Sequence, residues 1–403
     1  MVGSMIAESD WRLPSLSLAE RDRRWARARE LMAEANVDCL IASGPTGQHY
    51  RNAADVKYLT QLGHNSEEVT LLFPREGDVR VWTNPPGEWP NGNWIGATLP
   101  GGGSRVLLEA LKPHFARATI GVCGLAGGVF GTVRQPDGYF PHTALRRLAE
   151  NLPDARFVNA ADLLGRARFV KSAEEVQFLR CATQLAERGL HALLQTARVG
   201  VFEPLIMANI LQAEVAAGGT LPIMLGWISG PFGAANHRLE QPTHRLMQSG
   251  DYLMVELEGR WAGYIGQLDQ SVVVGKVPEW AHDAHQAAVQ SFWDVVQAMR
   301  PGVTLGELRE AARKVSRSPG VEGELIMHGR GLGDDGPLAL PRQPGGGELD
   351  RVALEENNVF LVKPNTIYRG HRDAGHVGDT VVVTASGAER LGTRPIEQFW
   401  RLD

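Results

Sequence analysis

The stretch DYLMVELEGRWAGYIGQLDQSVVVG, residues 251–275, decides the fold class of this chain. Valine, leucine and tyrosine dominate it, so it predicts two consecutive strands at residues 251–258 and 261–275. Two later stretches, 359–362 and 380–384, also predict strands. With the helices described next, the second half of the chain is predicted to be α+β, with antiparallel strands and segregated helices.

Four helices are predicted around these strands, at residues 172–197, 205–217, 280–299 and 304–316. Two of them begin with a capping box, in which a hydroxyl residue is followed three positions later by a glutamate. These boxes are Ser172 with Glu175 and Thr304 with Glu307. They mark where the helices begin without reference to the hydrophobic pattern.

The first half of the chain alternates helices and strands. A capping box of Ser17 and Glu20 opens a predicted helix that ends near residue 35. The other predicted elements are strands at 37–42, 67–73, 78–83 and 119–123, a long irregular loop at 85–103, and a helix at 143–151. The pattern predicts an α/β domain at residues 1–165, followed by a second domain at residues 166–403.

Composition excludes several classes of protein. The 403 residues carry 41 basic and 46 acidic side chains, a net charge of −5, which argues against a nucleic-acid binder with a basic surface. No apolar stretch approaches the roughly 20 residues of a membrane span, and no signal peptide is expected. The three cysteines form no metal-binding pattern and suit a reducing compartment. We therefore expect a cytoplasmic protein that binds neither nucleic acid nor membrane.

Six segments, in order, resemble the pita-bread domain of the creatinase, prolidase and aminopeptidase P family. They are RFVKSAEE at 168–175, residues 230–237 with 250–251, ELEGRWAGY at 256–264, MHGRGL at 327–332, residues 359–368 and residues 375–384. The resemblance covers residues 168–391, and KYLT at 57–60 loosely matches the family's first domain. It implies an antiparallel sheet flanked by helices, after a smaller creatinase-type α/β domain, in a homodimer.

Metalloenzymes of that family hold two metal ions with two aspartates, a histidine and two glutamates. The resemblance places the aspartates on Glu256 and Gln267, and the histidine on His328. The glutamates fall on Lys363 and Gly378. These replacements imply a site with no metal and no cofactor, because divalent cations need anionic oxygen ligands.

The register of this comparison is supported by Asp379, which matches the aspartate that follows the family's second glutamate. A shifted frame would make Asp269 a ligand, but it would break the match at Gly263 and Tyr264. We therefore keep Gln267 at the ligand position.

Lys363 is the most informative replacement. A protonated lysine cannot ligate a metal ion and would repel one. Its ammonium can instead supply positive charge in the place of the metal by pairing with Glu256. The alternative is an ordinary solvated lysine.

His237 matches the histidine that family members place over the substrate, and in creatinase, which works without metal, this histidine shuttles the proton. An imidazole suits that role because its pKa lies near neutrality. We therefore predict a catalytic set of five residues: His237, His328, Glu256, Gln267 and Lys363. His328 has an alternative role, holding a turn by hydrogen bonding.

The segments that line the pocket in the family are rich in arginine here, and arginine suits a carboxylate. The predicted substrate-binding residues are Arg330, Arg372, His376, Trp227 and Phe232. For the two aromatic residues, a place in the core is the competing interpretation. The loop at 85–103, or residues 64–65, could close the pocket of a partner subunit.

These observations predict a metal-independent hydrolase of a C–N bond, amide or amidine-like, in a small acidic substrate. A lyase that uses the same pocket and an inactive binding protein are alternatives, and a working metallopeptidase is a third. Creatinase itself is excluded, because it keeps glutamates where this chain has Gln267 and Lys363.

Overall fold

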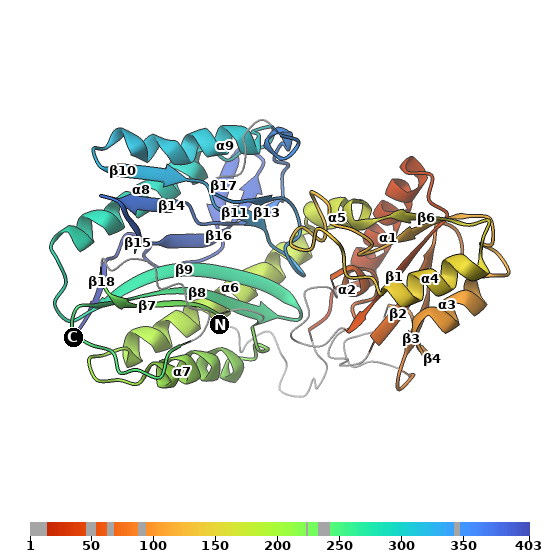
Figure 1. Ribbon diagram of the computed structural model, residues 1–403, viewed down its shortest axis with the longest axis horizontal. Coiled ribbons are helices and arrows are strands. Elements are labelled where there is room, and N and C mark those ends of the chain that lie inside the picture. The colour runs from red at the N-terminus through yellow and green to blue at the C-terminus, as the bar shows by residue number, and fades with distance from the viewer. Residues whose placement is uncertain are drawn as a thin grey trace. The chain divides into compact units, whose positions relative to one another are not determined.

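The computed structural model describes residues 14–45, 54–62, 68–87, 94–222, 225–232, 242–341 and 347–403, with the backbone alone described at 45 and 372–374. The chain divides into two compact units (Figure 1). Of the described residues, the C-terminal unit holds Glu175–Gly331 and Leu338–Asp403, and the N-terminal unit holds those up to Glu174 together with Leu332–Pro337. The predicted boundary between 165 and 166 falls inside helix α5 (Ala161–Phe169), which belongs to the N-terminal unit.

A six-stranded sheet, ordered β4-β3-β2-β1-β5-β6, forms the centre of the N-terminal unit. Strand β1 pairs with β2 antiparallel and with β5 parallel, so the sheet is mixed. Its strands are β1 (Cys39–Pro45), β2 (Glu68–Pro74), β3 (Arg80–Thr83), β4 (Leu99–Pro100), β5 (Thr119–Val122) and β6 (Arg156–Asn159). The other helices are α1 (Leu18–Glu34), α2 (Ala54–Thr60), α3 (Gly103–Leu111) and α4 (His142–Asn151). This is the predicted α/β unit.

The capping box at the start of α1 is present only in half. The Ser17 hydroxyl accepts a hydrogen bond from the Glu20 amide at 3.1 Å, as expected. The Glu20 carboxylate does not return it, because it pairs with the buried Arg24 at 2.6 Å. The Ser17 amide donates instead to Glu174 at 2.8 Å.

The C-terminal unit is built on a long antiparallel sheet, ordered β12-β11-β13-β16-β9-β8-β7. Two further strands join it, β17 on β16 and β18 on β9, of which β18 pairs parallel. A separate sheet is ordered β10-β14-β15. The helices are α6 (Ala173–Thr196), α7 (Glu203–Ala216), α8 (Trp280–Ala298) and α9 (Leu305–Ala312), the last with the complete predicted capping box. The predicted helices and antiparallel strands of this half are confirmed.

The strands of this unit are β7 (Leu225–Pro231), β8 (Asp251–Trp261), β9 (Tyr264–Val274), β10 (Val321–Glu324), β11 (Met327–Gly329), β12 (Leu338–Ala339), β13 (Val359–Val362), β14 (Asn365–Tyr368), β15 (His371–Gly375), β16 (Val377–Thr384), β17 (Gly387–Arg390) and β18 (Trp400–Leu402). Strands β8 and β9 correspond to the two strands predicted from residues 251–275. Within the described part of the chain, no helix has the length and apolar character needed to cross a membrane.

A tight turn joins β8 to β9. Ala262 and Gly263 have φ values of 48° and 90°, and Trp261 pairs with Tyr264 on either side of them. Two successive residues at positive φ are typical of the hairpin turn whose twist matches that of the flanking strands. The turn therefore fixes the register along both strands.

This register brings four polar residues to one face. Glu256 lies opposite Asp269, and Glu258 lies opposite Gln267. Side chains alternate between the two faces of a strand, so residues two apart point the same way. All four side chains therefore share one face of the hairpin.

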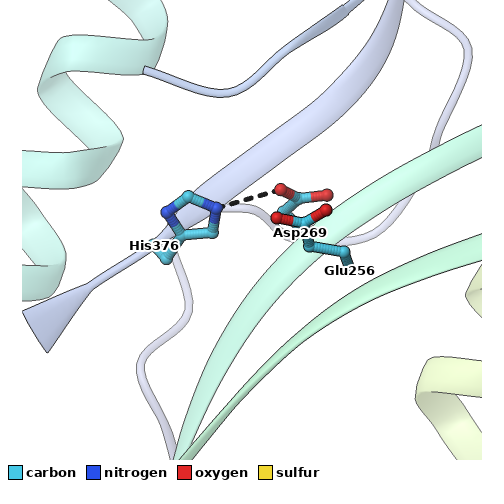
Figure 2. Close-up of side chains that lie close together, drawn as sticks. All are labelled: Glu256, Asp269 and His376. Carbon is cyan, nitrogen blue, oxygen red and sulfur yellow. Dashed lines mark hydrogen bonds and ion pairs between the residues drawn. The ribbon is translucent and has the colours of Figure 1, made fainter. Parts of the chain in front are cut away.

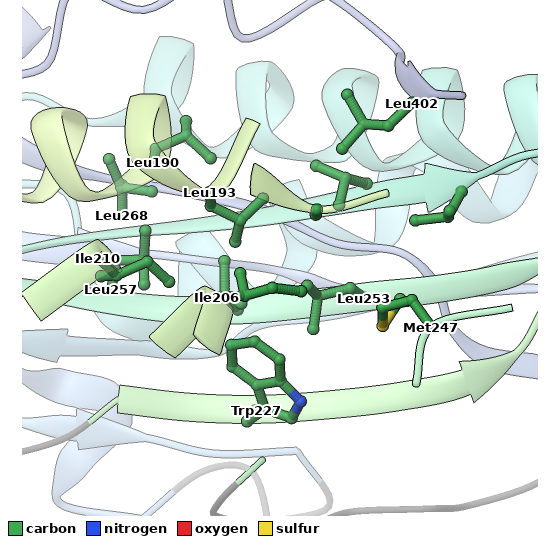
Figure 3. Packing of buried hydrophobic residues seen from close by; sticks show 14 of the residues in the cluster. Leu190, Leu193, Ile206, Ile210, Trp227, Met247, Leu253, Leu257, Leu268 and Leu402 are labelled. Atoms are coloured by element: carbon green, nitrogen blue, oxygen red, sulfur yellow. The ribbon is translucent and has the colours of Figure 1, made fainter. Parts of the chain in front are cut away.

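The other face of the hairpin is apolar and packs against α6 and α7 (Figure 3). Leu253 and Leu257 of β8 and Leu268 of β9 meet Leu193 of α6 and Ile206 of α7 in this cluster, and all are at most 1% exposed. The hairpin thus has a hydrophobic core on one face and a polar site on the other.

Candidate functional site

Four buried side chains from separate elements form what we call the central cluster. Glu256 comes from β8 and Asp269 from β9, Lys363 directly follows β13, and His376 lies between β15 and β16. Figure 2 shows Glu256, Asp269 and His376 converging on one point. Each of the four residues is at most 6% exposed. The resemblance suggests Glu256, Lys363 and His376, but not Asp269.

The ammonium of Lys363 lies between two carboxylates. Its Nζ is 2.7 Å from Oε2 of Glu256 and 3.3 Å from Oδ2 of Asp269. On the other side of Asp269, His376 Nε2 lies 2.9 Å from the same Oδ2 atom (Figure 2). Charges buried at this depth are tolerated only when they are paired, so the four side chains are energetically interdependent.

The electrostatics of the cluster keep Asp269 ionised. Burial alone would raise the pKa of this carboxyl, but the charge of Lys363 and the hydrogen bond from His376 outweigh it. The pKa of Asp269 therefore lies well below its usual range. The cluster therefore favours the ionised form of Asp269 beside the ammonium of Lys363.

Gln267 joins the cluster from the side. Its Nε2 donates to Oδ1 of Asp269 at 2.8 Å and lies 3.5 Å from Oε2 of Glu256. An ionised carboxylate only accepts hydrogen bonds, so the NH₂ group of Gln267 must face the two acids. Its Oε1 is buried and has no hydrogen-bond partner among the described residues.

Two glycines make room for the cluster. A Cβ atom at Gly378 would lie 2.6 Å from the Cβ of Lys363 and 3.1 Å from that of Asp269. A Cβ atom at Gly226, which lies opposite Glu256 in the sheet, would meet the Cβ of Glu256 at 2.9 Å. Gly378, the position of a family glutamate, is thus where the backbone comes close enough to admit Lys363.

A second buried ion pair lies on the same face of β8. Glu258 and Arg330 are 3.0 Å apart and each is at most 1% exposed. Arg330 was predicted to bind the substrate, and the structure places it in an ion pair. Its guanidinium is engaged by Glu258, whose buried charge needs a partner.

His328 lies on β11, opposite Leu361 of β13, and is 1% exposed. Its Nδ1 is 3.4 Å from the carbonyl oxygen of Gly329. Strands β13 and β16 separate β11 from β9 in the sheet order. His237 lies outside the described residues, and Arg372 is among those whose side chains are not described.

The structure does not place Trp227 in the site. Gly226 faces Glu256, so the next residue along β7 points to the opposite face, and Trp227 is buried in the hydrophobic core there (Figure 3). This position agrees with the competing interpretation that Trp227 belongs to the core.

Phe232, the other aromatic residue predicted to bind substrate, packs against other rings. Its ring centroid is 5.8 Å from that of Tyr252 and 4.8 Å from that of Trp280, and His371 stacks on Trp280 at 4.8 Å. Phe232 therefore belongs to an aromatic cluster rather than standing as a free wall of a pocket.

The residues present do not fit a two-metal site. At the positions that match the family's ligands, Gln267 is neutral, Lys363 is a cation and Gly378 has no side chain. Ligand atoms of Glu256, Asp269 and His376 do lie within 4.8 Å of one another, a spacing that would suit one cation. The ammonium of Lys363 already touches two of these three groups and would repel a divalent ion.

Comparisons with known proteins agree with this architecture. A model of metallopeptidase family M24 matches residues 177–385. An Xaa-Pro dipeptidase of Pyrococcus furiosus is 23% identical over 261 residues, which cover 63% of this chain and 72% of that protein. A Sinorhizobium fredii protein named as the uncharacterized hydrolase/peptidase y4tM is 25% identical over 409 residues, covering 96% and 98% of the two chains.

Solved structures show the same fold over nearly the whole chain. The X-Pro aminopeptidase from Thermotoga maritima superposes with a TM-score of 0.72 at 18% identity, covering 94% of this chain and 99% of that one. Dipeptidase PepE from Mycobacterium ulcerans gives a TM-score of 0.73 at 22% identity, covering 96% and 99%. The predicted pita-bread architecture is thereby confirmed.

Proposed function

The chain belongs to metallopeptidase family M24, and on this premise we propose that it is a hydrolase that works without a bound metal ion. The bond cleaved is a C–N bond, amide or amidine-like, in a small substrate that carries a carboxylate. Relatives named as dipeptidases and aminopeptidases support hydrolysis of such a bond. A homodimer, on the family resemblance, and a cytoplasmic location, on the cysteine pattern, complete the proposal.

The observation that carries the proposal is the position of Lys363. Its ammonium, 2.7 Å from Glu256 and 3.3 Å from Asp269, supplies the positive charge that a metal-dependent relative would take from its ions. A fixed cation in a buried site favours the negative charge that develops on the carbonyl oxygen during attack. Gly378 supports the same interpretation, because the absence of its side chain admits the lysine.

The remaining chemistry needs an acid/base group. We assign it to His237, as the resemblance implies, with Gln267 orienting the water or the scissile group. A neutral imidazole takes a proton from the attacking water and returns it to the leaving nitrogen. Arg372, on β15, is the arginine proposed to receive the substrate carboxylate.

One observation favours a second candidate, a metal-dependent peptidase. Glu256, Asp269 and His376 offer three ligand atoms within 4.8 Å of one another, which could hold one cation if Lys363 gave way. A single hydrolysis assay, with and without a chelator, separates the two functions.

In that assay, purified protein is incubated with small amides and amidines that carry a carboxylate, with and without a chelator. The proposal predicts turnover of at least one compound at a rate that the chelator does not change. Turnover that requires added manganese or cobalt would instead support the metallopeptidase. Saturable binding without turnover of any compound would support the inactive binding protein.

A further inference from the structure

The amide of Gln267 is held in a single orientation at the centre of the site. Its NH₂ group points to Asp269 and Glu256, because both carboxylates accept and neither donates. The usual ambiguity between the two ends of a glutamine amide is therefore resolved by its neighbours. The carbonyl end, Oε1, must point away from the two acids.

Within the described part of the chain, this oxygen is a buried acceptor without a hydrogen-bond partner. Gln267 is 0% exposed, and its Oε1 has no hydrogen-bond partner among the residues that the structure describes. Buried acceptors are nearly always satisfied, so one that is not calls for an explanation such as a ligand or an ordered water. Here the explanation must also account for its place on the face that carries Glu256, Glu258 and Asp269.

We infer that Oε1 of Gln267 accepts a hydrogen bond from an N–H group at the scissile bond of the substrate. The inference rests on the proposed function and narrows its substrate class. An acceptor needs a donor, and the donors available at a C–N bond are the N–H groups of a primary or secondary amide or of an amidine. The nitrogen of a peptide bond to proline carries no hydrogen and cannot satisfy it.

The substrate class therefore differs from the one in the names of the Xaa-Pro relatives. A site built to bond an N–H group rejects an analogue without one, because the buried acceptor is then left unpaired. Lys363, bound to the carboxylates beside Gln267, cannot take over this role, because an ammonium has no acceptor to offer the N–H group of the substrate.

The test compares two compounds that differ only in this donor. N-acetyl-L-alanine has an amide N–H, and O-acetyl-L-lactate has an ester oxygen in its place. Their dissociation constants are measured on the wild-type protein, on Gln267→Met, and on the control Gln270→Met. Gln270 is an equally buried glutamine on the same strand, hydrogen-bonded to Ser271 and Arg394. Release of acetate is followed in the same samples.

We expect the wild-type protein to bind the amide at least about 10-fold more tightly than the ester. Gln267→Met should bring the two compounds to within about twofold of one another, and Gln270→Met should keep the preference. If Gln267→Met does not fold, the wild-type comparison alone decides.

Equal affinities in the wild-type protein, a preference that survives in Gln267→Met, or no binding of either compound at tens of millimolar would each overturn the inference. A preference without acetate release would support Gln267 as the acceptor while removing the proposed hydrolase. Acetate release with equal affinities for the two compounds would support the proposed hydrolase and remove Gln267 as the acceptor.

Discussion

The Nζ atom of Lys363 lies 2.7 Å from Oε2 of Glu256, and each residue is only 6% exposed. Metalloenzymes of this family use carboxylates to hold metal ions. In this chain a carboxylate holds a buried ammonium instead. The pair connects the fold to the proposed chemistry, since β8 carries the carboxylate and the residue after β13 carries the ammonium.

Replacing Lys363 by methionine should leave Glu256 and Asp269 buried without their shared cation. Removing one partner of a buried ion pair typically costs about 3–5 kcal/mol, so the free energy of unfolding should fall by that order and turnover should be lost. Urea unfolding followed by circular dichroism measures the first effect. The exposed Lys314→Met is the matched control and should change little. A Lys363→Met protein of wild-type stability would show that the pair carries no buried charge.

Adding one methyl group at Gly378 should disturb the central cluster, because the methyl group would press on Lys363 and Asp269. The new Cβ would lie 2.6 Å from the Cβ of Lys363, so Gly378→Ala should lose about 1–3 kcal/mol of stability and most of the activity. Gly387→Ala, on the neighbouring strand β17, would place its methyl group in open space with no atom within 4 Å, and it serves as the control. Equal behaviour of the two variants would contradict the tight approach at Gly378.

Glu214, which lies outside the central cluster, should make the stability of the protein depend on pH. Burial, with the nearby charge of Glu258, raises its pKa to about 9, and neither carboxyl oxygen has a partner among the described residues. A carboxyl whose pKa is raised on folding stabilises the protein fully below its unfolded pKa, and the contribution is lost as the pH rises through the folded value.

Glu214→Gln should therefore gain stability relative to the wild type between about pH 5.5 and 7.5, by an amount on the order of 2 kcal/mol. Thermal and urea unfolding at both pH values measure it, with the exposed Glu322→Gln as control. A difference between Glu214→Gln and wild type that does not change with pH would show that Glu214 is ionised in the folded protein.

His237 is the proposed carrier of the proton. His237→Ala should lower kcat by about 100- to 10 000-fold, the usual contribution of a general acid/base, with a smaller change in KM. The exposed His142→Ala is the control. If His237→Ala turns over normally, the role must pass to another histidine, and His376 is the first to test, because its buried Nδ1 has no partner among the described residues.

The sequence predicted the frame of the site well, because long elements carry strong local signals. The β8–β9 strands and the capping box of Thr304 and Glu307 are both read from adjacent residues, and both are confirmed. Short strands such as β11 and β12 carry no such pattern. They exist through pairing with distant parts of the chain, which composition and periodicity do not reveal.

The same reason explains what the sequence does not reveal about the site. The register that matches Gln267 to a family ligand passes over Asp269, yet both residues point to the same face of β9. Strand alternation alone is sufficient to bring Asp269 back as a candidate, and to send Trp227 to the face opposite Gly226. The contact of Arg330 with Glu258 joins the residue that follows β11 to strand β8 and has no signal in the sequence.

The central claim is that the ammonium of Lys363 takes the place of the family's metal ions. Its most direct test is elemental analysis of the protein purified from medium supplemented with manganese, cobalt and zinc. The account predicts well below one divalent ion per chain. One or two ions per chain, lost on substituting Glu256→Gln, would contradict it and restore the metallopeptidase.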